Sequence, residues 1–408
     1  MNIKKLKHHK KIIENFSYLS VLQILSMITP LVTYPYLVKT LGEVIYGTVV
    51  FAQAVVTYFN ILVVFGFNFT AARDVSQYRD DTKKLSEIVS AVTIIKTLFL
   101  IVSLLLISGY MLYISQIDYT LYYLSFWICL NEILFPSWFF QGKEEMKYIT
   151  FINLGIRLLF ILMIFIFIKS PDDYLYFPLL NGIGVALAGV VSFILLYKKY
   201  KVRLTLVPIK ILTKYLKESY HLFISNISIQ IYVNANKIII GTFLGMREVT
   251  YYDLAEKITN MGKVPQSMIS QVLYPKISLE RNGSFLKKVL KGTILMNVFL
   301  YLMVFLFSNQ IVAYFGGNET VLRILFLTIP IIGISNVLMV LTLLPFGYNK
   351  AFTRIVFLSA FFYLFIVLIL YGFSFISLYT LTATNVIVES LVSIIAYIYV
   401  RRKKIINL

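Results

Sequence analysis

Apolar stretches of about 20 residues recur along the whole chain, and this is the length that an α-helix needs to cross a bilayer. The 408 residues are 59% hydrophobic and only 14% charged, whereas soluble chains are about 45–50% apolar and about 25% charged. Such a chain cannot cover a water-soluble globule with polar surface, and the alternating pattern of a β-barrel is absent. The sequence therefore predicts an all-α integral membrane protein.

We expect about twelve spanning helices from these stretches. The expected spans are 14–38, 44–67, 88–113, 117–140, 149–168, 174–197, 218–243, 250–275, 290–314, 320–345, 353–373 and 376–400. The first span follows a basic tail, as a signal peptide does, but its apolar run is longer than the 7–15 residues typical of such a peptide. We therefore expect it to be retained.

The basic residues divide unequally between alternate loops. Of the 38 Lys and Arg residues, 29 lie in the two tails and in the loops after even-numbered spans, and four lie in the other loops. Because cytoplasmic loops carry the excess of Lys and Arg, we expect both termini in the cytoplasm. The net charge of +19 is then a topology signal that also meets anionic lipids, and nucleic-acid binding is not expected.

The two halves of the chain contain similar turns. Gly42 lies between the first and second spans and Gly245 between the seventh and eighth, each after a Leu and shortly before a Tyr. Pro136 and Pro345 form a second pair, near the cytoplasmic ends of their spans. These pairs predict two six-helix lobes that are related by an axis along the membrane normal, an arrangement found in transporters.

A short linker joins the expected lobes, which comprise residues 1–200 and 218–408. Within the linker, 201–217, apolar residues recur at helical spacing opposite a row of lysines, and Pro208 suits a helix start. We expect an amphipathic helix on the inner leaflet. The alternative is an ordinary basic loop.

The sequence contains no signature of an enzyme. The longest segment outside the expected spans, 198–217, has about 20 residues, too few for a catalytic domain. Neither a phosphate-binding loop motif nor a His-Glu-x-x-His zinc motif occurs, and the single Cys129 is expected to be a buried core residue. We therefore expect transport, with no catalysis, cofactor or metal site.

Ionisable side chains at bilayer depth are costly and are candidates for function. In the first half, Lys96, Glu132 and Arg157 each lie about eight residues from the cytoplasmic end of their span, roughly 12 Å along a helix. This equal depth predicts an ion cluster, for which the alternative role is a structural ion pair.

Polar stripes at helical spacing mark the spans 218–243 and 250–275, and a milder stripe marks 44–67. Lipid would exclude such stripes, so they must line a wet cavity or a helix contact, and we favour a substrate cavity. The predicted site comprises Lys237, Lys257, Lys263, Arg157 and Lys96 as cationic groups, Gln53, Asn60, Gln230, Asn234 and Asn260 as polar lining, and Glu132, Asp253, Glu256 and Glu389 for charge pairing or ion coupling.

Four stretches, 35–47, 65–73, 138–146 and 236–257, resemble those of a known family. The most specific is 138–146, which reads Trp-Phe-Phe-Gln-Gly-Lys-Glu-Glu-Met. Over essentially its full length the chain resembles the Wzx-type O-antigen flippases, in the superfamily that also contains MATE-type multidrug exporters and the lipid II flippase. The family often has Asp before the basic residue of the fourth stretch. Because Asn236 stands there, the resemblance does not place an acidic coupling site at this position.

The resemblance implies a MATE-like transporter of the bacterial inner membrane. Its substrate would be an O-antigen or lipopolysaccharide repeat unit on undecaprenyl pyrophosphate, moved from the cytoplasmic to the periplasmic leaflet. Cationic cavity residues would hold the diphosphate, and rocking of the lobes would give alternating access. Implied partners are a polymerase and a chain-length regulator, and we expect a monomer.

Two alternative functions make different demands on the sequence. A MATE-like drug or cation antiporter needs a mainly acidic cavity, whereas the polar stripes carry lysines. A membrane-embedded polysaccharide polymerase or glycosyltransferase needs a large external loop, which we do not find.

Overall fold

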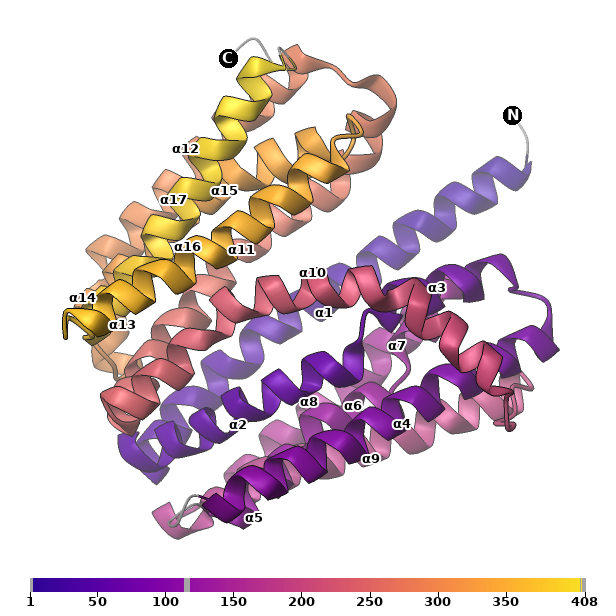
Figure 1. Cartoon of the computed structure of the whole chain (residues 1–408), viewed down its shortest axis with the longest axis horizontal. Coiled ribbons are helices and arrows are strands. Elements are labelled where there is room, and N and C mark those ends of the chain that lie inside the picture. The colour runs from indigo at the N-terminus through magenta and orange to yellow at the C-terminus, as the bar shows by residue number, and fades with distance from the viewer. Residues whose placement is uncertain (1–2, 114–117, 404, 406–408) are drawn as a thin grey trace. The chain divides into compact units, whose positions relative to one another are not determined.

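The computed structural model describes residues 3–113, 118–403 and 405, and all regular structure in these residues is helical, as expected (Figure 1). The contacts divide the chain into two compact units. The N-terminal unit comprises Met1–Ile45 and Ala52–Ile227, and the C-terminal unit comprises Tyr46–Phe51 and Ser228–Leu408.

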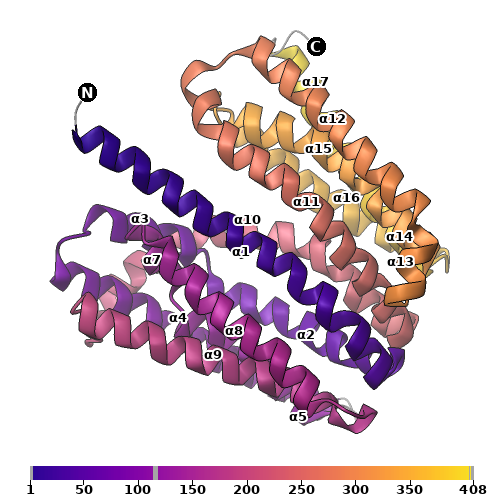
Figure 2. The same ribbon diagram turned by 180° about the vertical axis from the view of Figure 1, so that it is seen from behind.

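The N-terminal unit contains the helices up to the first part of α10, except for Tyr46–Phe51 of α2. Their bounds are α1 Ile3–Leu41, α2 Glu43–Val64, α3 Phe67–Gln77, α4 Thr82–Tyr113, α5 Tyr119–Ser125, α6 Trp127–Leu134, α7 Ser137–Gly142, α8 Met146–Phe167, η1 Pro171–Leu175, α9 Tyr176–Ile194 and η2 Leu195–Lys199. Helix α8 packs against α1 and α9, and α3 packs against α7 (Figure 2).

The C-terminal unit contains Tyr46–Phe51 of α2, the rest of α10 and all later helices. Their bounds are α10 Ile209–Phe243, α11 Met246–Glu280, α12 Gly283–Leu306, α13 Ser308–Phe315, α14 Glu319–Phe326, α15 Thr328–Leu338, η3 Met339–Leu343, α16 Asn349–Gly372 and α17 Leu378–Arg402. Helix α15 packs against α12 and α17, and α11 packs against α14.

Nine helical segments in the described residues are long and apolar enough to cross a membrane. They are Ser20–Leu41, Glu43–Gln77, Thr82–Leu112, Met146–Phe167, Pro171–Lys199, Gly283–Leu306, Glu319–Leu343, Asn349–Gly372 and Leu378–Arg402. Three expected spans are not among them: 117–140, 218–243 and 250–275. The total of twelve spans therefore stays a prediction.

The expected span 117–140, of which residue 117 lies outside the described residues, contains three short helices from 118 onward instead of one. The side chain of Asp118 caps α5 by accepting a hydrogen bond from the backbone N–H of Leu121 (3.2 Å). Helix α6 ends before Pro136, and α7 begins after it. Proline lacks the N–H that a continuing helix requires, so the break follows from the sequence.

The stretch 138–146 is a packing element of the N-terminal unit. Trp138, Phe139 and Phe140 are at most 2% exposed and belong to the core of this unit. Gly142 at the end of α7 faces α3 so closely that a Cβ atom there would lie 2.6 Å from the carbonyl oxygen of Ala72. The most specific part of the family resemblance thus serves the contact between α3 and α7.

The two glycines of the similar turns, Gly42 and Gly245, have similar backbone conformations. Gly42 precedes α2 with φ 81° and ψ 158°, and Gly245 precedes α11 with φ 127° and ψ 173°. Positive φ costs glycine little because it has no Cβ. This similarity supports the internal repeat, which stays a prediction.

Helix α10 runs without interruption from Ile209 to Phe243. The expected linker, 201–217, is therefore a non-helical segment, 201–208, followed by the first turns of α10. The contacts separate the two units between Ile227 and Ser228, inside this helix. The expected division into lobes 1–200 and 218–408 stays a prediction.

Replacing Gly142 with Ala tests the contact between α3 and α7. We expect Gly142→Ala to destabilise the purified protein by about 1–3 kcal/mol, because the new methyl group meets backbone and a buried valine at less than 3 Å. Gly155→Ala on α8 is the matched control, since nothing lies within 4 Å of its Cβ position. Thermal unfolding in detergent measures both, and equal midpoints would contradict the packing role.

Candidate functional site

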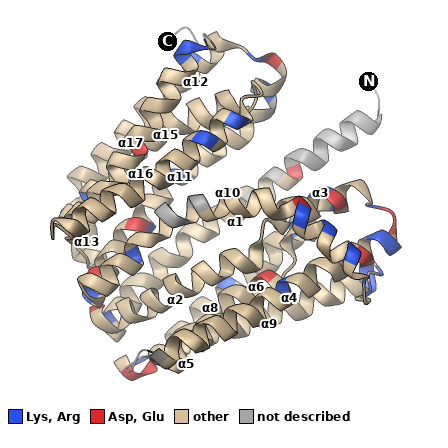
Figure 3. Ribbon diagram, viewed as in Figure 1, with Lys and Arg blue, Asp and Glu red and all other residues tan. Residues whose placement is uncertain are grey.

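Helices α10 and α11 are long helices that contain none of the apolar segments found in the described residues. Each has 35 residues. Figure 3 shows long uncharged stretches along most other helices, with charged segments mainly toward helix ends. Because lipid cannot solvate ionic groups, the polar side chains of α10 and α11 must contact each other, other protein groups or water.

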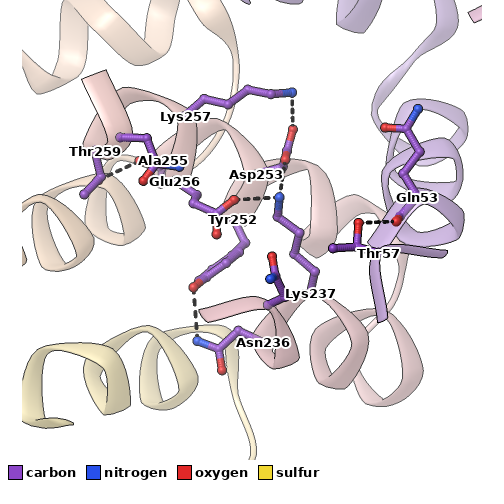
Figure 4. A network of polar contacts seen from close by, with 12 residues as sticks. Gln53, Thr57, Asn236, Lys237, Tyr252, Asp253, Ala255, Glu256, Lys257 and Thr259 are labelled. Atoms are coloured by element: carbon purple, nitrogen blue, oxygen red, sulfur yellow. Dashed lines mark hydrogen bonds and ion pairs between the residues drawn. The ribbon is translucent and has the colours of Figure 1, made fainter. Parts of the chain in front are cut away.

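A network of ion pairs joins α10 to α11 (Figure 4). The ammonium of Lys237 lies 2.8 Å from Asp253 Oδ1 and 2.6 Å from Glu256 Oε2. The other carboxylate oxygen of Asp253 lies 2.5 Å from Lys257 Nζ. Tyr46 completes the network, because its hydroxyl accepts a hydrogen bond from Lys257 (2.5 Å) and donates one to Asp253 (3.3 Å).

The network contains two lysines and two carboxylates, so its formal charges cancel. Asp253 is 3% exposed and Lys237 is 14% exposed, whereas Lys257 is 30% exposed. A buried charge needs both a counter-ion and hydrogen bonds to offset its lost hydration. Lys237 and Lys257, predicted as cations for a substrate, are thus bound by the acidic residues predicted for charge pairing.

Asn236, next to Lys237, is a fully buried centre of hydrogen bonds. Its amide nitrogen donates to the carbonyl oxygen of Leu381 (3.0 Å) and to the hydroxyl of Tyr252 (3.1 Å). Its amide oxygen accepts from the hydroxyl of Tyr363 (2.5 Å). A carboxylate could not donate to the Leu381 carbonyl, which gives a physical reason for Asn at this position.

A pocket of about 60 Å³ lies within the C-terminal unit and has room for several water molecules. Its polar lining includes Tyr252, Glu256, Asn260, Lys263 and Glu389. Lys263 donates a hydrogen bond to Asn260 Oδ1 (3.0 Å). Within the described part of the chain, Lys263 and Glu389 form no ion pair with each other or with another residue. Both therefore retain hydrogen-bonding capacity for a ligand or water.

Of the ion cluster predicted in the first half, Lys96, Glu132 and Arg157, two members form an ion pair: Lys96 and Glu132. Lys96 is 1% exposed, and its ammonium lies 2.9 Å from Glu132 Oε2. The same ammonium donates to the carbonyl oxygen of Glu132 (3.0 Å) and to Asn68 Oδ1 (3.4 Å). This buried pairing favours a structural role for Lys96.

Arg157, the third member of the predicted cluster, lies apart from that pair. Helix α4, with Lys96, packs against α6, with Glu132, whereas α8, with Arg157, packs against α1 and α9. Arg157 is partly buried and forms no hydrogen bond or ion pair among the residues that the structure describes. The N–H donors of the Arg157 guanidinium are therefore available to a ligand or to water.

The predicted polar lining residues have different local environments. Gln230 accepts a hydrogen bond from Asn234 one turn later on α10. On α2, Gln53 Nε2 and Asn60 Oδ1 are buried without a hydrogen-bond partner among the described residues. Buried polar atoms without partners are rare in folded proteins, so these two atoms stay candidates for contact with water or substrate.

Sequence reasoning missed several residues of these networks. Tyr46 and Asn236 lie within the stretches that carry the family resemblance, but neither was placed in the site. Asn385 also escaped notice, although its amide donates to the hydroxyl of Tyr252 (2.7 Å). The available signal was a polar side chain inside an apolar span, because such a side chain needs a partner there.

Comparison with solved structures identifies the fold. The structure matches that of a multidrug resistance MATE family transporter of the MOP superfamily in its inward-facing conformation, with a TM-score of 0.69 and 14% sequence identity. The match covers 92% of this chain and 98% of that chain. The expected MATE-like fold is therefore confirmed.

Sequence comparison identifies the family. A model of the polysaccharide biosynthesis protein family matches residues 12–279. Two relatives named "Putative O-antigen transporter" are each 26% identical to this chain, one from Escherichia coli (strain K12), over 87% of this chain and 88% of its own length, and one from Shigella dysenteriae, over 84% and 88%. The chain belongs to the polysaccharide biosynthesis protein family, and the resemblance to Wzx-type flippases is confirmed.

Removal of the central lysine tests the ion network. We expect Lys237→Met to destabilise the protein by about 3–5 kcal/mol, because it leaves Glu256 without its cation and Asp253 with one lysine. Lys257→Met should cost less, since Lys257 is more exposed and Asp253 keeps Lys237. The double variant Lys237→Met/Glu256→Gln should recover part of the loss. Unfolding temperatures in detergent give the ranking, and an unchanged midpoint for Lys237→Met would refute it.

Proposed function

We propose that the protein moves a lipid-linked oligosaccharide across the bacterial inner membrane. The cargo is an O-antigen or related polysaccharide repeat unit on undecaprenyl pyrophosphate, and it passes from the cytoplasmic to the periplasmic leaflet. The observation that carries this proposal is the family match over residues 12–279, together with relatives named as O-antigen transporters. The physical need is clear, because sugars and diphosphate cannot enter hydrocarbon without polar partners.

In this proposal the chain crosses the membrane twelve times, with both termini in the cytoplasm. The nine apolar segments supply nine crossings. Helices α10 and α11 and the broken segment α5–α7 supply the other three. The distribution of basic residues between alternate loops supports this orientation.

Arg157 and Lys263 are the proposed contacts for the diphosphate. Of the five predicted cationic residues, these two have no carboxylate partner among the described residues. A diphosphate binds best to cations that still have donors to offer, and a guanidinium can bind it through two hydrogen bonds. We assign Lys96, Lys237 and Lys257 to structural ion pairs.

Alternating access of the two units would complete the transport cycle. The membrane potential favours the outward step, because moving negative charge out of an inside-negative cell gains about 2.3 kcal/mol per charge per 100 mV. A polymerase and a chain-length regulator are the expected partners after the flip.

Deletion of the gene in its native host tests the function itself. We expect single repeat units on undecaprenyl pyrophosphate to accumulate on the cytoplasmic face of the inner membrane. Measuring the leaflet of these lipids decides between classes of protein. Unpolymerised units on the outer face would indicate a polymerase, and unchanged glycan with altered drug sensitivity would indicate an antiporter.

Neutral substitutions test the two proposed contacts. Arg157→Gln and Lys263→Gln should each lower transport about tenfold or more at unchanged protein abundance, because a charge-assisted hydrogen bond contributes about 1.5–3 kcal/mol. Arg157→Lys should retain part of the activity. Arg354→Gln, at an exposed position near the start of α16, is the control. Complementation of the deletion strain measures transport, and normal surface glycan from both Gln variants would remove these residues from the site.

A further inference from the structure

The non-helical segment 201–208 is fastened along the start of α4 in the N-terminal unit. The side-chain oxygen of Ser86 accepts a hydrogen bond from the backbone N–H of Arg203 (3.1 Å). One turn later, Ser90 accepts one from the backbone N–H of Thr205 (2.9 Å). Val202 is buried, and its N–H donates to the carbonyl oxygen of Leu196 (2.9 Å). These hydrogen bonds give the segment a defined position on the surface of the N-terminal unit.

Two neighbouring grooves open beside this segment and share Arg203. The apolar groove is lined by Val89, Phe193, Leu196, Tyr197, Val202 and Leu204 in addition to Arg203. The basic groove contains Lys83 and Lys201 in addition to Arg203, together with Glu87. Arg203 thus stands where a hydrocarbon surface meets a cationic one.

The charges of the basic groove favour an anion. Glu87, its only carboxylate among the described lining residues, lies 3.1 Å from the ammonium of Lys84 and is already paired. No ion pair engages Lys83, Lys201 or Arg203 within the described part of the chain. The guanidinium of Arg203 lies over the ring of Tyr197, 5.8 Å from its centroid.

The position of the grooves corresponds to the level of lipid headgroups. The apolar segment Thr82–Leu112 begins here and the apolar segment Pro171–Lys199 ends here. Around them, apolar side chains stay uncovered: Tyr197 is 60% exposed, Leu204 56% and Leu206 97%. Exposed apolar groups beside basic groups are typical of a surface that meets the membrane interface.

We propose that these grooves bind one anionic glycerophospholipid. An acyl chain lies in the apolar groove, and the phosphate accepts hydrogen bonds from Arg203, Lys201 and Lys83 in the basic groove. Basic pockets between helices at the cytoplasmic side of membrane proteins bind such headgroups, and a guanidinium suits a phosphate oxygen pair. This site is separate from Arg157 and Lys263, and it does not depend on the identity of the transported substrate.

Native mass spectrometry of the full-length protein in detergent tests the proposal. The probes are long-chain phosphatidylglycerol, long-chain phosphatidylcholine, dihexanoyl phosphatidylglycerol, inorganic phosphate and undecaprenyl pyrophosphate. We expect long-chain phosphatidylglycerol to bind most tightly, since it alone offers both an anionic headgroup and long glycerol-linked acyl chains.

Two variants locate the binding. Lys201→Gln/Arg203→Gln should weaken phosphatidylglycerol binding about tenfold or more, because charge-assisted hydrogen bonds to phosphate are lost. Both side chains are exposed, so folding should persist. The matched control is Arg402→Gln, at another exposed basic position, and it should bind as the unaltered protein does.

Several results would overturn the proposal. Equal phosphatidylglycerol binding by the double variant and the control would remove these grooves as its site. Equal binding of the dihexanoyl lipid, or competition by inorganic phosphate at the same concentration, would show a plain anion site. Preference for undecaprenyl pyrophosphate, lost in the double variant, would make the grooves an entry site for the cargo.

Discussion

The absence of water from the hydrocarbon core is the constraint on which the rest of this structure depends. Every backbone amide there must bond within its own segment, so the long apolar segments of the described chain are helical. The same constraint acts on side chains. Lys96 lies against Glu132, and Lys237 lies between Asp253 and Glu256, because an isolated charge in this environment would cost several kcal/mol.

These pairings change how the intramembrane charges are understood. Five basic residues at bilayer depth suggest a cationic cavity, but three of them are held by carboxylates. Arg157 and Lys263 remain as the cations with donors available for an anion. The proposed diphosphate site therefore rests on few residues, while the other charges join helices in ion pairs. The neutral network also explains how helices as polar as α10 and α11 remain stable in the C-terminal unit.

The stretches that identify the family act mainly on the fold. Trp138, Phe139 and Phe140 fill the core of the N-terminal unit, and Gly142 permits the contact with α3. Asn236 joins α10 to α11, α16 and α17 through hydrogen bonds to Tyr252, Tyr363 and Leu381. Residues that preserve a transporter fold can thus be easier to recognise in a sequence than residues that select its cargo.

The sequence alone determined the membrane class, nine apolar helical segments long enough to cross a membrane and the presence of polar stripes, because hydropathy and helical spacing are local properties of the chain. It also identified the charged residues that need partners. Only the tertiary structure decided which partner each one has: Tyr46 meets Lys257 across 211 positions of sequence, while Arg157 does not reach Glu132. Such pairings depend on how helices rotate and pack against one another. The break at Pro136 follows from the sequence, whereas the continuity of α10 through 209–243 was settled by packing, which no local pattern records.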